Sequence, residues 1–167
     1  AYEMLRSLVG SEMCIRDSIY TDAVLAGFDD ALVLNQDGHI AEASAANFFL
    51  IRNGVAYTSP ISANILEGIT RRTVMHLLRE ELNVEVVERE LDRTEIFIAD
   101  EAFLCGTGVQ LAAVTRIDNR SVGDGQMGPI TQRLRDLYFA VVRGEAPAYR
   151  HWNQPIYAET VITAPGD

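Results

Sequence analysis

The 167-residue sequence contains no lysine, because all 14 residues counted as lysine or arginine are arginine. A reaction that needs a lysine amine, such as Schiff-base formation with a carbonyl compound, therefore cannot be carried out by this chain alone. Only two cysteines occur, Cys14 and Cys105, too few for a disulfide framework or a cysteine metal cluster. We expect Cys105, within AFLCGT, to be a small buried apolar residue.

Basic residues are also in the minority. The chain has 24 Asp+Glu against 14 Lys+Arg, which gives a net charge of −10 and a pI near 4.7. A nucleic-acid surface needs clustered basic residues, so we expect no nucleic-acid partner. No apolar run approaches the ~20 residues that cross a bilayer, and the N-terminus lacks the order of a signal peptide. These absences predict a cytoplasmic protein with no membrane partner.

Metal chemistry has no support in the sequence either. His39, His76 and His151 are not spaced like metal ligands, so no metal site is predicted. What the chain does have is a 48% share of hydrophobic residues and enough length for one domain with a core.

Regular patterning begins near Thr21. DAVLAG predicts a short helical turn stopped by Gly27, and ALVLN, IAEASAANFFLIR and VAYTS predict strands. Asn53-Gly54 separates the last two, and both residues tolerate positive φ, which predicts a hairpin. The first half is therefore expected to be an antiparallel meander.

The second half predicts two amphipathic helices. Apolar residues at helical spacing place the first from about Gly68 to Leu82, with Ile69 on its apolar face. GPITQRLRDLYFAVVRGE predicts the second, with Pro129 in its first turn and Gly144 at its end. Strands are expected in VEVVERE, AFLC and VQLAAVTRID, and an irregular tail follows the second helix. The fold class is therefore α+β, a mostly antiparallel, partly barrel-like sheet with two main helices.

The turn EGIT, Glu67–Thr70, is the first candidate anion site. Gly68 exposes the backbone, and Ile69 and Thr70 open a helix, so unpaired N–H groups and the positive end of the helix dipole could bind a phosphate. The Thr70 hydroxyl would add a donor. Plain helix capping explains the same residues, and the motif alone leaves both readings open.

The loop CGTGVQ is the second candidate. It follows a strand, and Gly106 and Gly108 flank Thr107, an arrangement that can direct several N–H groups at an oxyanion. It is not a dinucleotide fingerprint, because the third glycine and the following helix are missing. A simple tight turn is the alternative.

The third candidate is Glu42, an acid among small and apolar residues in AEASAANF. A buried carboxylate needs a partner because an unpaired buried charge is costly, and a cationic ring nitrogen would serve. An exposed glutamate on an edge strand fits the pattern equally well.

Five segments occur in the order and spacing of class IV pyridoxal-phosphate aminotransferases. They are AGFDDALVLNQDGHIAEASAANFFLIRNGVAYTSP, ILEGITRRTV, ERELDRTEIFIADEAFLCGTG, VTRID and GPITQRLRDLYFAVVRGE. The sequence most resembles the branched-chain group of that family. The resemblance implies an incomplete large cofactor-binding domain over residues 19–157, with a frayed tail over 158–167. It further implies pyridoxal 5′-phosphate as cofactor, an amino acid and a 2-oxo acid as substrates, and a homodimer.

The resemblance also implies roles for the three candidate sites. Glu42 would bond the pyridine nitrogen and keep it protonated, so that the ring can accept electrons from the substrate. The phosphate contacts would come from Gly68, Ile69, Thr70 and Thr107. The amides of Thr107 and Gly108 would bind the substrate carboxylate.

Departures from the family pattern leave the substrate open. Ala43 and Ala45 stand where many relatives have glycine, and GTGVQ stands where GTAAE is commoner. A D-amino-acid aminotransferase or an aminodeoxychorismate lyase is the alternative within the family, and a non-catalytic anion- or cofactor-binding module is the alternative outside it. The long helix and the AYRHW tail favour the branched-chain group, with leucine, isoleucine or valine and 2-oxoglutarate as substrates.

The Schiff-base lysine of the family would fall within SLVGSEMCIRDS, Ser7–Ser18. This stretch has neither helical nor strand periodicity. EMCIRDS is encoded by GAG ATG TGT ATA AGA GAC AG(C/T), which resembles the transposon end used in sequencing-library adapters. We therefore interpret residues 1–18 as a non-native, adapter-derived segment, and predict an inactive fragment with no catalytic residue.

Overall fold

The computed structural model describes residues 16–154. Most of the segment interpreted as adapter-derived, residues 1–15, lies outside the described residues, and so does the tail predicted over 158–167. Within the described part, residues 16–25 form a helix that ends in a turn at Gly27, whose φ is +87°. The predicted helical turn is therefore present and is longer than DAVLAG.

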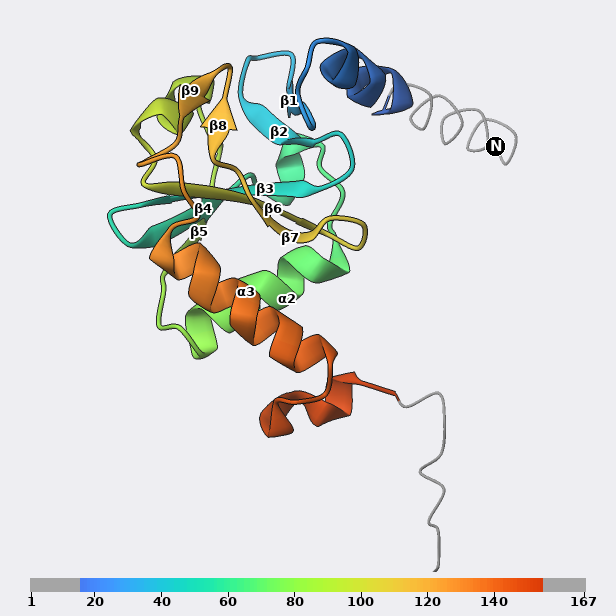
Figure 1. Cartoon of the computed structure of the whole chain (residues 1–167), viewed down its shortest axis with the longest axis vertical. Helices are drawn as coiled ribbons and strands as arrows, with labels where there is room; N and C mark the ends of the chain where they lie inside the picture. Colours follow the sequence, from blue (N-terminus) through green and yellow to red (C-terminus); the bar gives the residue numbers. More distant parts are fainter. Residues whose placement is uncertain (1–15, 155–167) are drawn as a thin grey trace, which may run out of the picture.

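A five-stranded sheet with strand order β5-β4-β3-β6-β7 forms the centre of the molecule (Figure 1). Its strands are β3 (Asn47–Arg52), β4 (Val55–Thr58), β5 (Val86–Glu88), β6 (Glu101–Gly106) and β7 (Gln110–Ala113). The pairs are antiparallel except β4 with β5, which run parallel. Two smaller antiparallel sheets pair β1 (Leu32–Leu34) with β2 (Ile40–Ala43), and β8 (Arg116–Ile117) with β9 (Arg120–Ser121).

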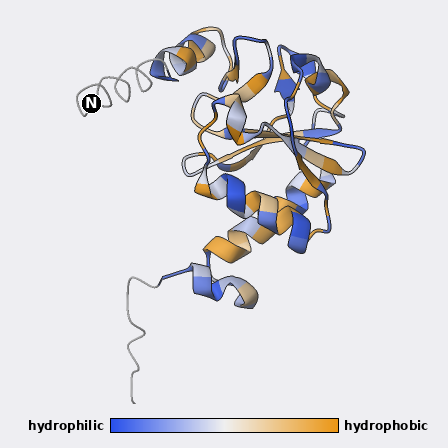
Figure 2. Ribbon diagram, turned by 180° about the vertical axis from the view of Figure 1, so that it is seen from behind, coloured by the Kyte–Doolittle hydropathy of each residue, from blue (hydrophilic) through white to orange (hydrophobic). Residues whose placement is uncertain are grey.

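The two long helices, α2 (Ile69–Glu80) and α3 (Pro129–Val142), pack on one face of this sheet (Figure 1). Both carry apolar and polar residues, as expected of helices with one buried side (Figure 2). Phe49 and Phe103 stack face to face in the core between helices and sheet, with ring centroids 4.9 Å apart. Short 3₁₀ helices complete the fold: η1 (Ile61–Ala63), η2 (Arg93–Ile98) and η3 (Pro147–Trp152).

Strand β3 is buried on both faces. Phe49 and Ile51 pack toward the helices, while Phe48 and Leu50 pack into a second apolar cluster on the opposite face. This double burial explains why FFLI, between Asn47 and Arg52, is a continuous apolar run with no alternation. Among residues 16–154, no helix combines the length and the apolar character needed to cross a bilayer.

The structure confirms the α+β class and both long helices, and it corrects four details. The VQLAAVTRID segment, expected as one strand, divides into β7 and β8, which belong to different sheets. The IAEASAANFFLIR segment divides at residues 44–46 into β2 and β3, which belong to different sheets. Ile69, expected on the apolar face of the helix, is 75% exposed, because the buried side of α2 begins with the next two residues, Thr70 and Arg71. The part of the tail expected to be irregular contains η3, which packs against α2 through Tyr149 and Trp152.

Candidate functional site

The carboxylate of Glu42 is buried at the edge of β2, with 8% of the residue exposed. Its Oε2 atom accepts hydrogen bonds from the Leu66 N–H at 3.0 Å and from Asn47 Nδ2 at 3.2 Å. Its Oε1 atom lies 3.0 Å from a guanidinium nitrogen of Arg16. The exposed edge-strand reading of Glu42 is therefore wrong: the carboxylate is buried, and a cation faces one of its oxygens.

The predicted phosphate site lies at the N-terminus of α2. Gly68 is the N-cap residue in an extended conformation, and no side chain makes a capping hydrogen bond to this end. The first N–H groups of a helix have no partner within the helix, so those of Ile69 and Thr70 can donate to an anion. Thr70 is buried, with 9% exposed, whereas the Ile69 side chain points into solvent. Capping by a side chain within the described residues does not account for this turn.

Asn47, the first residue of β3, connects these two places. Its Nδ2 atom donates to Glu42 Oε2 and also to the Leu66 carbonyl, at 2.8 Å. Its Oδ1 atom lies so near Gly68 that a Cβ there would approach it to 2.6 Å. The sequence reading did not single out Asn47. The available signal was a polar residue at the start of a buried apolar strand, where its amide must find partners.

The turn after β6 carries the predicted oxyanion site of the CGTGVQ loop. Thr107 and Gly108 are exposed, and a Cβ on Gly108 would meet nothing within 4 Å. Gly106 packs against the β2–β3 connection, since a Cβ there would lie 3.3 Å from the Ala45 carbonyl oxygen. The turn therefore lies beside the loop between Glu42 and Asn47.

The three predicted sites thus meet at one edge of the molecule. Figure 1 shows the N-terminal end of α2 and the β6–β7 turn at the edge where β3 begins. Pyridoxal 5′-phosphate needs a carboxylate for its ring nitrogen and N–H donors for its phosphate. The buried Glu42 and the uncapped end of α2 supply both. The residues fit non-covalent binding, while the lysine-free chain offers no amine for covalent attachment.

Arg71 lies next to this site and was also missed by the sequence reading. Its side chain is only 2% exposed, donates to the Ser59 carbonyl at 2.9 Å, and pairs with Glu88 at 2.7 Å. The pair joins α2 to the end of β5. Burial raises the pKa of the nearby Cys105 thiol to about 12, which confirms this cysteine as a buried, inert residue.

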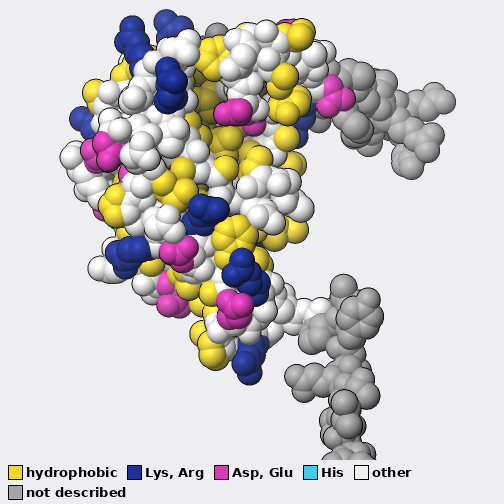
Figure 3. Space-filling model, viewed as in Figure 1, with side chains coloured by type: hydrophobic (Ala, Val, Ile, Leu, Met, Phe, Trp, Pro, Cys, Tyr) yellow, Lys and Arg dark blue, Asp and Glu magenta, His cyan; other side chains and the backbone are white. Residues whose placement is uncertain are grey.

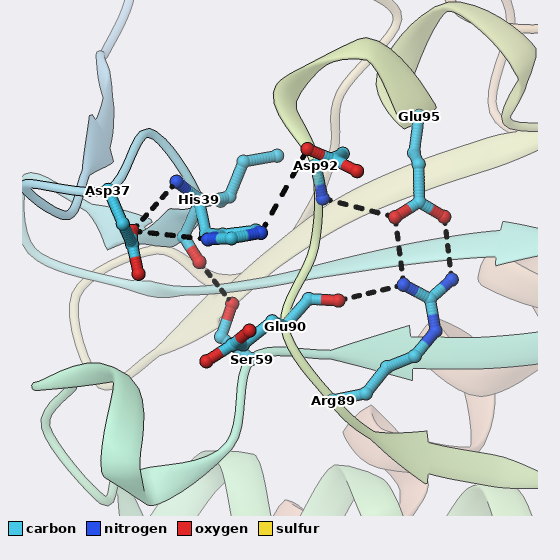
Figure 4. Close-up of polar contacts among 8 residues, drawn as sticks. Asp37, His39, Ser59, Arg89, Glu90, Asp92 and Glu95 are labelled. Atoms are coloured by element: carbon cyan, nitrogen blue, oxygen red, sulfur yellow. Dashed lines mark hydrogen bonds and ion pairs between the residues drawn. The ribbon is translucent and has the colours of Figure 1, made fainter.

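A second polar cluster holds the start of β2 in place (Figure 4). His39 Nδ1 lies 3.1 Å from the Asp37 carboxylate, and Nε2 lies 3.9 Å from Asp92. The adjacent Asp37 carboxylate favours the protonated ring and raises the pKa of His39 above its ordinary value. The Ser59 hydroxyl donates to the Ile40 carbonyl at 2.6 Å, two residues before Glu42. These contacts fix the strand that presents the carboxylate.

A hollow of about 1050 Å³ with a mixed apolar and charged lining lies beside the site, on the sheet face away from the helices. Its lining includes Phe28, Leu34, Ala43, Leu104 and Val109. Ala43 follows Glu42 in sequence, and Val109 follows Gly108. Figure 3 looks toward this region, where hydrophobic side chains are exposed between the β8–β9 and β1–β2 hairpins.

Comparison with known proteins gives a consistent result. The family model described as class IV amino-transferase matches residues 16–117. A probable branched-chain-amino-acid aminotransferase of Aquifex aeolicus is 47% identical over 137 residues, covering 82% of this chain and 44% of that protein. A branched-chain-amino-acid aminotransferase of Pseudomonas aeruginosa is 39% identical over 131 residues, covering 78% and 42%.

Solved structures agree with the sequence relatives. The branched-chain amino acid aminotransferase of Thermobaculum terrenum in its PLP form superposes with a TM-score of 0.84 at 43% identity, covering 87% of this chain and 48% of that one. A branched-chain aminotransferase from Thermoproteus uzoniensis gives a TM-score of 0.83 at 36% identity, covering 87% and 48%. The chain thus spans less than half the length of these relatives.

Proposed function

Because the chain belongs to the class IV aminotransferase family, we propose that it is part of a pyridoxal 5′-phosphate enzyme that moves amino groups between branched-chain amino acids and 2-oxoglutarate. The observation that carries this proposal is the buried Glu42 carboxylate, hydrogen-bonded to the turn that leads into the uncapped end of α2. We further propose that the complete enzyme is a cytoplasmic homodimer.

Glu42 would hold a proton on the ring nitrogen of the cofactor. When bound, pyridoxal 5′-phosphate supplies a ring that accepts the electrons released as the amino acid loses its Cα proton. A neighbouring carboxylate favours the protonated ring nitrogen, and burial strengthens that attraction. The burial of the Glu42 carboxylate and the two hydrogen bonds that fix its Oε2 atom support this role.

The two anion sites would orient the cofactor and the substrate. The N–H groups of Ile69 and Thr70, with the Thr70 hydroxyl, would bind the phosphate, and Gly68 would let it approach the backbone. Thr107 would add a phosphate donor, and the amides of Thr107 and Gly108 would bind the substrate carboxylate. Their exposed turn leaves these groups accessible to a ligand.

The part of the hollow near Ala43, Leu104 and Val109 supports a substrate with a hydrocarbon side chain. It borders both Ala43 and Val109, so a side chain extending from the carboxylate site would enter apolar surroundings. We infer that only part of this volume receives the substrate, because one amino acid side chain is much smaller than the hollow.

This chain would be inactive, because it has no lysine for covalent attachment of the cofactor and for proton transfer at the substrate Cα. The uninterrupted reading frame upstream of Asp22 would restore that lysine in place of the adapter-derived residues.

The test compares this chain with the protein encoded by that reading frame. The longer protein should turn over leucine, isoleucine and valine with 2-oxoglutarate, and should show a visible absorbance that borohydride bleaches. The present chain should do neither. In the longer protein, Glu42→Ala should sharply reduce turnover while the visible absorbance remains, and Thr70→Ala should mainly weaken cofactor affinity.

Three results would count against the proposal. One is turnover restricted to D-amino acids or to aminodeoxychorismate, which would move the protein to another group of the family. Another is unchanged turnover in the Glu42→Ala variant. The third is a borohydride-reducible absorbance formed at a specific site by the lysine-free chain.

A further inference from the structure

We propose that Asn47 is a positioning residue that holds the ring-nitrogen acid Glu42 and the phosphate-binding turn before α2 at one fixed separation. The inference rests on the proposed function of this site. Asn47 would touch neither the substrate nor the cofactor, and would act through the two groups on either side of it.

The first support is a closed ring of three hydrogen bonds. Asn47 Nδ2 donates to Glu42 Oε2 and to the Leu66 carbonyl, and the Leu66 N–H donates to the same Oε2 atom. Each of the three residues therefore contacts the other two. Moving Glu42 relative to the turn at Leu66 would break at least one of these bonds, and a buried polar group left without a partner is costly.

The second support is the contact between Asn47 and Gly68. The Asn47 side chain is anchored at both Nδ2 contacts, so its Oδ1 atom cannot swing aside freely. A Cβ at position 68 would come within 2.6 Å of that atom. Gly68 is the residue directly before the N–H donors of Ile69 and Thr70, so Asn47 packs against the backbone that aims them.

Asn47 is itself fixed by the sheet. It is 5% exposed and is paired with Cys105 at the first position of β3. Asn47 therefore fixes both ligand-binding groups relative to the central sheet. A strand of the sheet is a more rigid support than a loop.

The neutral amide is also the right chemistry for this position. An aspartate at position 47 would place a second negative charge against the Glu42 carboxylate. A lysine or arginine there would compete with the ring nitrogen for that carboxylate. Asparagine satisfies Oε2 without changing the charge. The other oxygen, Oε1, is the one that faces the Arg16 guanidinium.

Fixed spacing matters because the cofactor is one rigid molecule. Its ring nitrogen and its phosphate can be bound together only if the two protein groups match the distance between them. When they match, the second contact forms as an intramolecular step and the two contacts reinforce each other. Loss of Asn47 should therefore lower the affinity for a ligand that has both the ring nitrogen and the phosphate far more than the affinity for a ligand that has only one of them.

Three probes separate these effects without needing a lysine: pyridoxamine 5′-phosphate, pyridoxamine and inorganic phosphate. Binding to the 167-residue chain is measured by calorimetry, with and without Arg16→Ala, which removes the guanidinium from Glu42. In Asn47→Ala, affinity for pyridoxamine 5′-phosphate should fall about tenfold or more, the effect of losing hydrogen bonds to a charged group. Affinity for each single-group probe should change less than about twofold.

Two further variants complete the design. Gly68→Ala disturbs the same contact from the other side, and it also narrows the approach of the phosphate. It should therefore weaken binding of pyridoxamine 5′-phosphate and of inorganic phosphate but not of pyridoxamine, even if Asn47→Ala folds poorly. Asn35→Ala is the matched control, because Asn35 also donates one amide hydrogen bond to a backbone carbonyl, that of Ala63 at 3.0 Å. It should lower the melting temperature without changing the affinity for any probe.

The possible failures are distinguishable. If pyridoxamine 5′-phosphate binding depends on Glu42 and Thr70 but Asn47→Ala leaves it unchanged, the positioning role is wrong and the proposed function stands. Equal weakening of all three probes would make Asn47 a general stabiliser of the fold and would overturn the proposal. If pyridoxamine 5′-phosphate binds no better than inorganic phosphate in either background, both the proposed function and this inference fail.

Discussion

Replacing Glu88 with alanine should destabilise the fold by removing the partner of a buried cation. The Arg71 side chain is 2% exposed and the Glu88 side chain 34% exposed, with a 2.7 Å contact between them. Without Glu88, the guanidinium would keep only the Ser59 carbonyl, since its Nε atom has no partner among the described residues. The variant therefore leaves a buried charge that is poorly compensated.

The expected magnitude follows from the burial of the two partners. Breaking a fully buried ion pair costs about 3–5 kcal/mol. Because Glu88 is about one-third exposed, water can reach the vacated side, and we expect about 2 kcal/mol instead. Arg79, 4.0 Å from Glu88 and itself exposed, adds little. For a chain of this size, a loss of about 2 kcal/mol lowers the melting temperature by about 4–8 °C.

The assay is urea and thermal unfolding followed by circular dichroism. Glu85→Ala is the matched control, because Glu85 is exposed, lies just before the same strand, and should cost less than about 0.5 kcal/mol. The double variant Arg71→Met/Glu88→Ala should recover much of the loss, since an apolar side chain needs no counter-charge. If Glu88→Ala is no less stable than Glu85→Ala, the buried pair does not contribute as argued.

Three other outcomes can be checked directly. The raised pKa of His39 means that protonated His39 stabilises the fold below its unfolded pKa of about 6.5, and that this contribution is lost as the pH rises through the folded pKa. His39→Gln should therefore flatten the decline in melting temperature over that window, and an unchanged slope would contradict the assignment. Cys105, with a pKa near 12, should resist iodoacetamide at pH 8 until urea unfolds the chain, as read by mass spectrometry of its peptide. Leu134→Ala, at a fully buried position of α3, should cost about 2–5 kcal/mol in urea unfolding, and a loss below 1 kcal/mol would mean that the site collapses around the gap.

Local signals in the sequence were sufficient for the turns and the helix ends. Asn53 and Gly54 adopt the positive φ values, 52° and 77°, that a tight hairpin requires. Pro129 starts α3, and Gly144, with φ of 75°, follows its end. Such features depend on a few adjacent residues, so they can be read without knowing the fold.

Features set by distant contacts could not be read in the same way. Helical spacing placed Ile69 on the apolar face, but only the tertiary packing determines that Thr70 and Arg71 are the buried residues of that turn and Ile69 the exposed one. The parallel partner of β5 is likewise fixed by the path of the chain rather than by VEVVERE.

The site was predicted only in part for the same reason. The sequence suggested Glu42 and the two anion-binding turns, each with an equally plausible structural alternative. It gave no indication of Asn47 or Arg71, because their roles come from partners 19 and 17 residues away in the chain, Leu66 and Glu88. A single polar residue beside an apolar run does not reveal which distant group it will bond.

The parallel pairing of β4 with β5 has a consequence for the order in which the molecule is built. The β3–β4 and β6–β7 pairs are hairpins that can close early, whereas β5 can join β4 only after the chain has passed through α2. The end of α2 proposed to bind the phosphate lies within that crossover, so it should reach its final place in one of the last steps of folding. A ligand that binds there would bind only the fully folded domain. It would therefore shift the equilibrium of this last folding step toward the folded state by mass action.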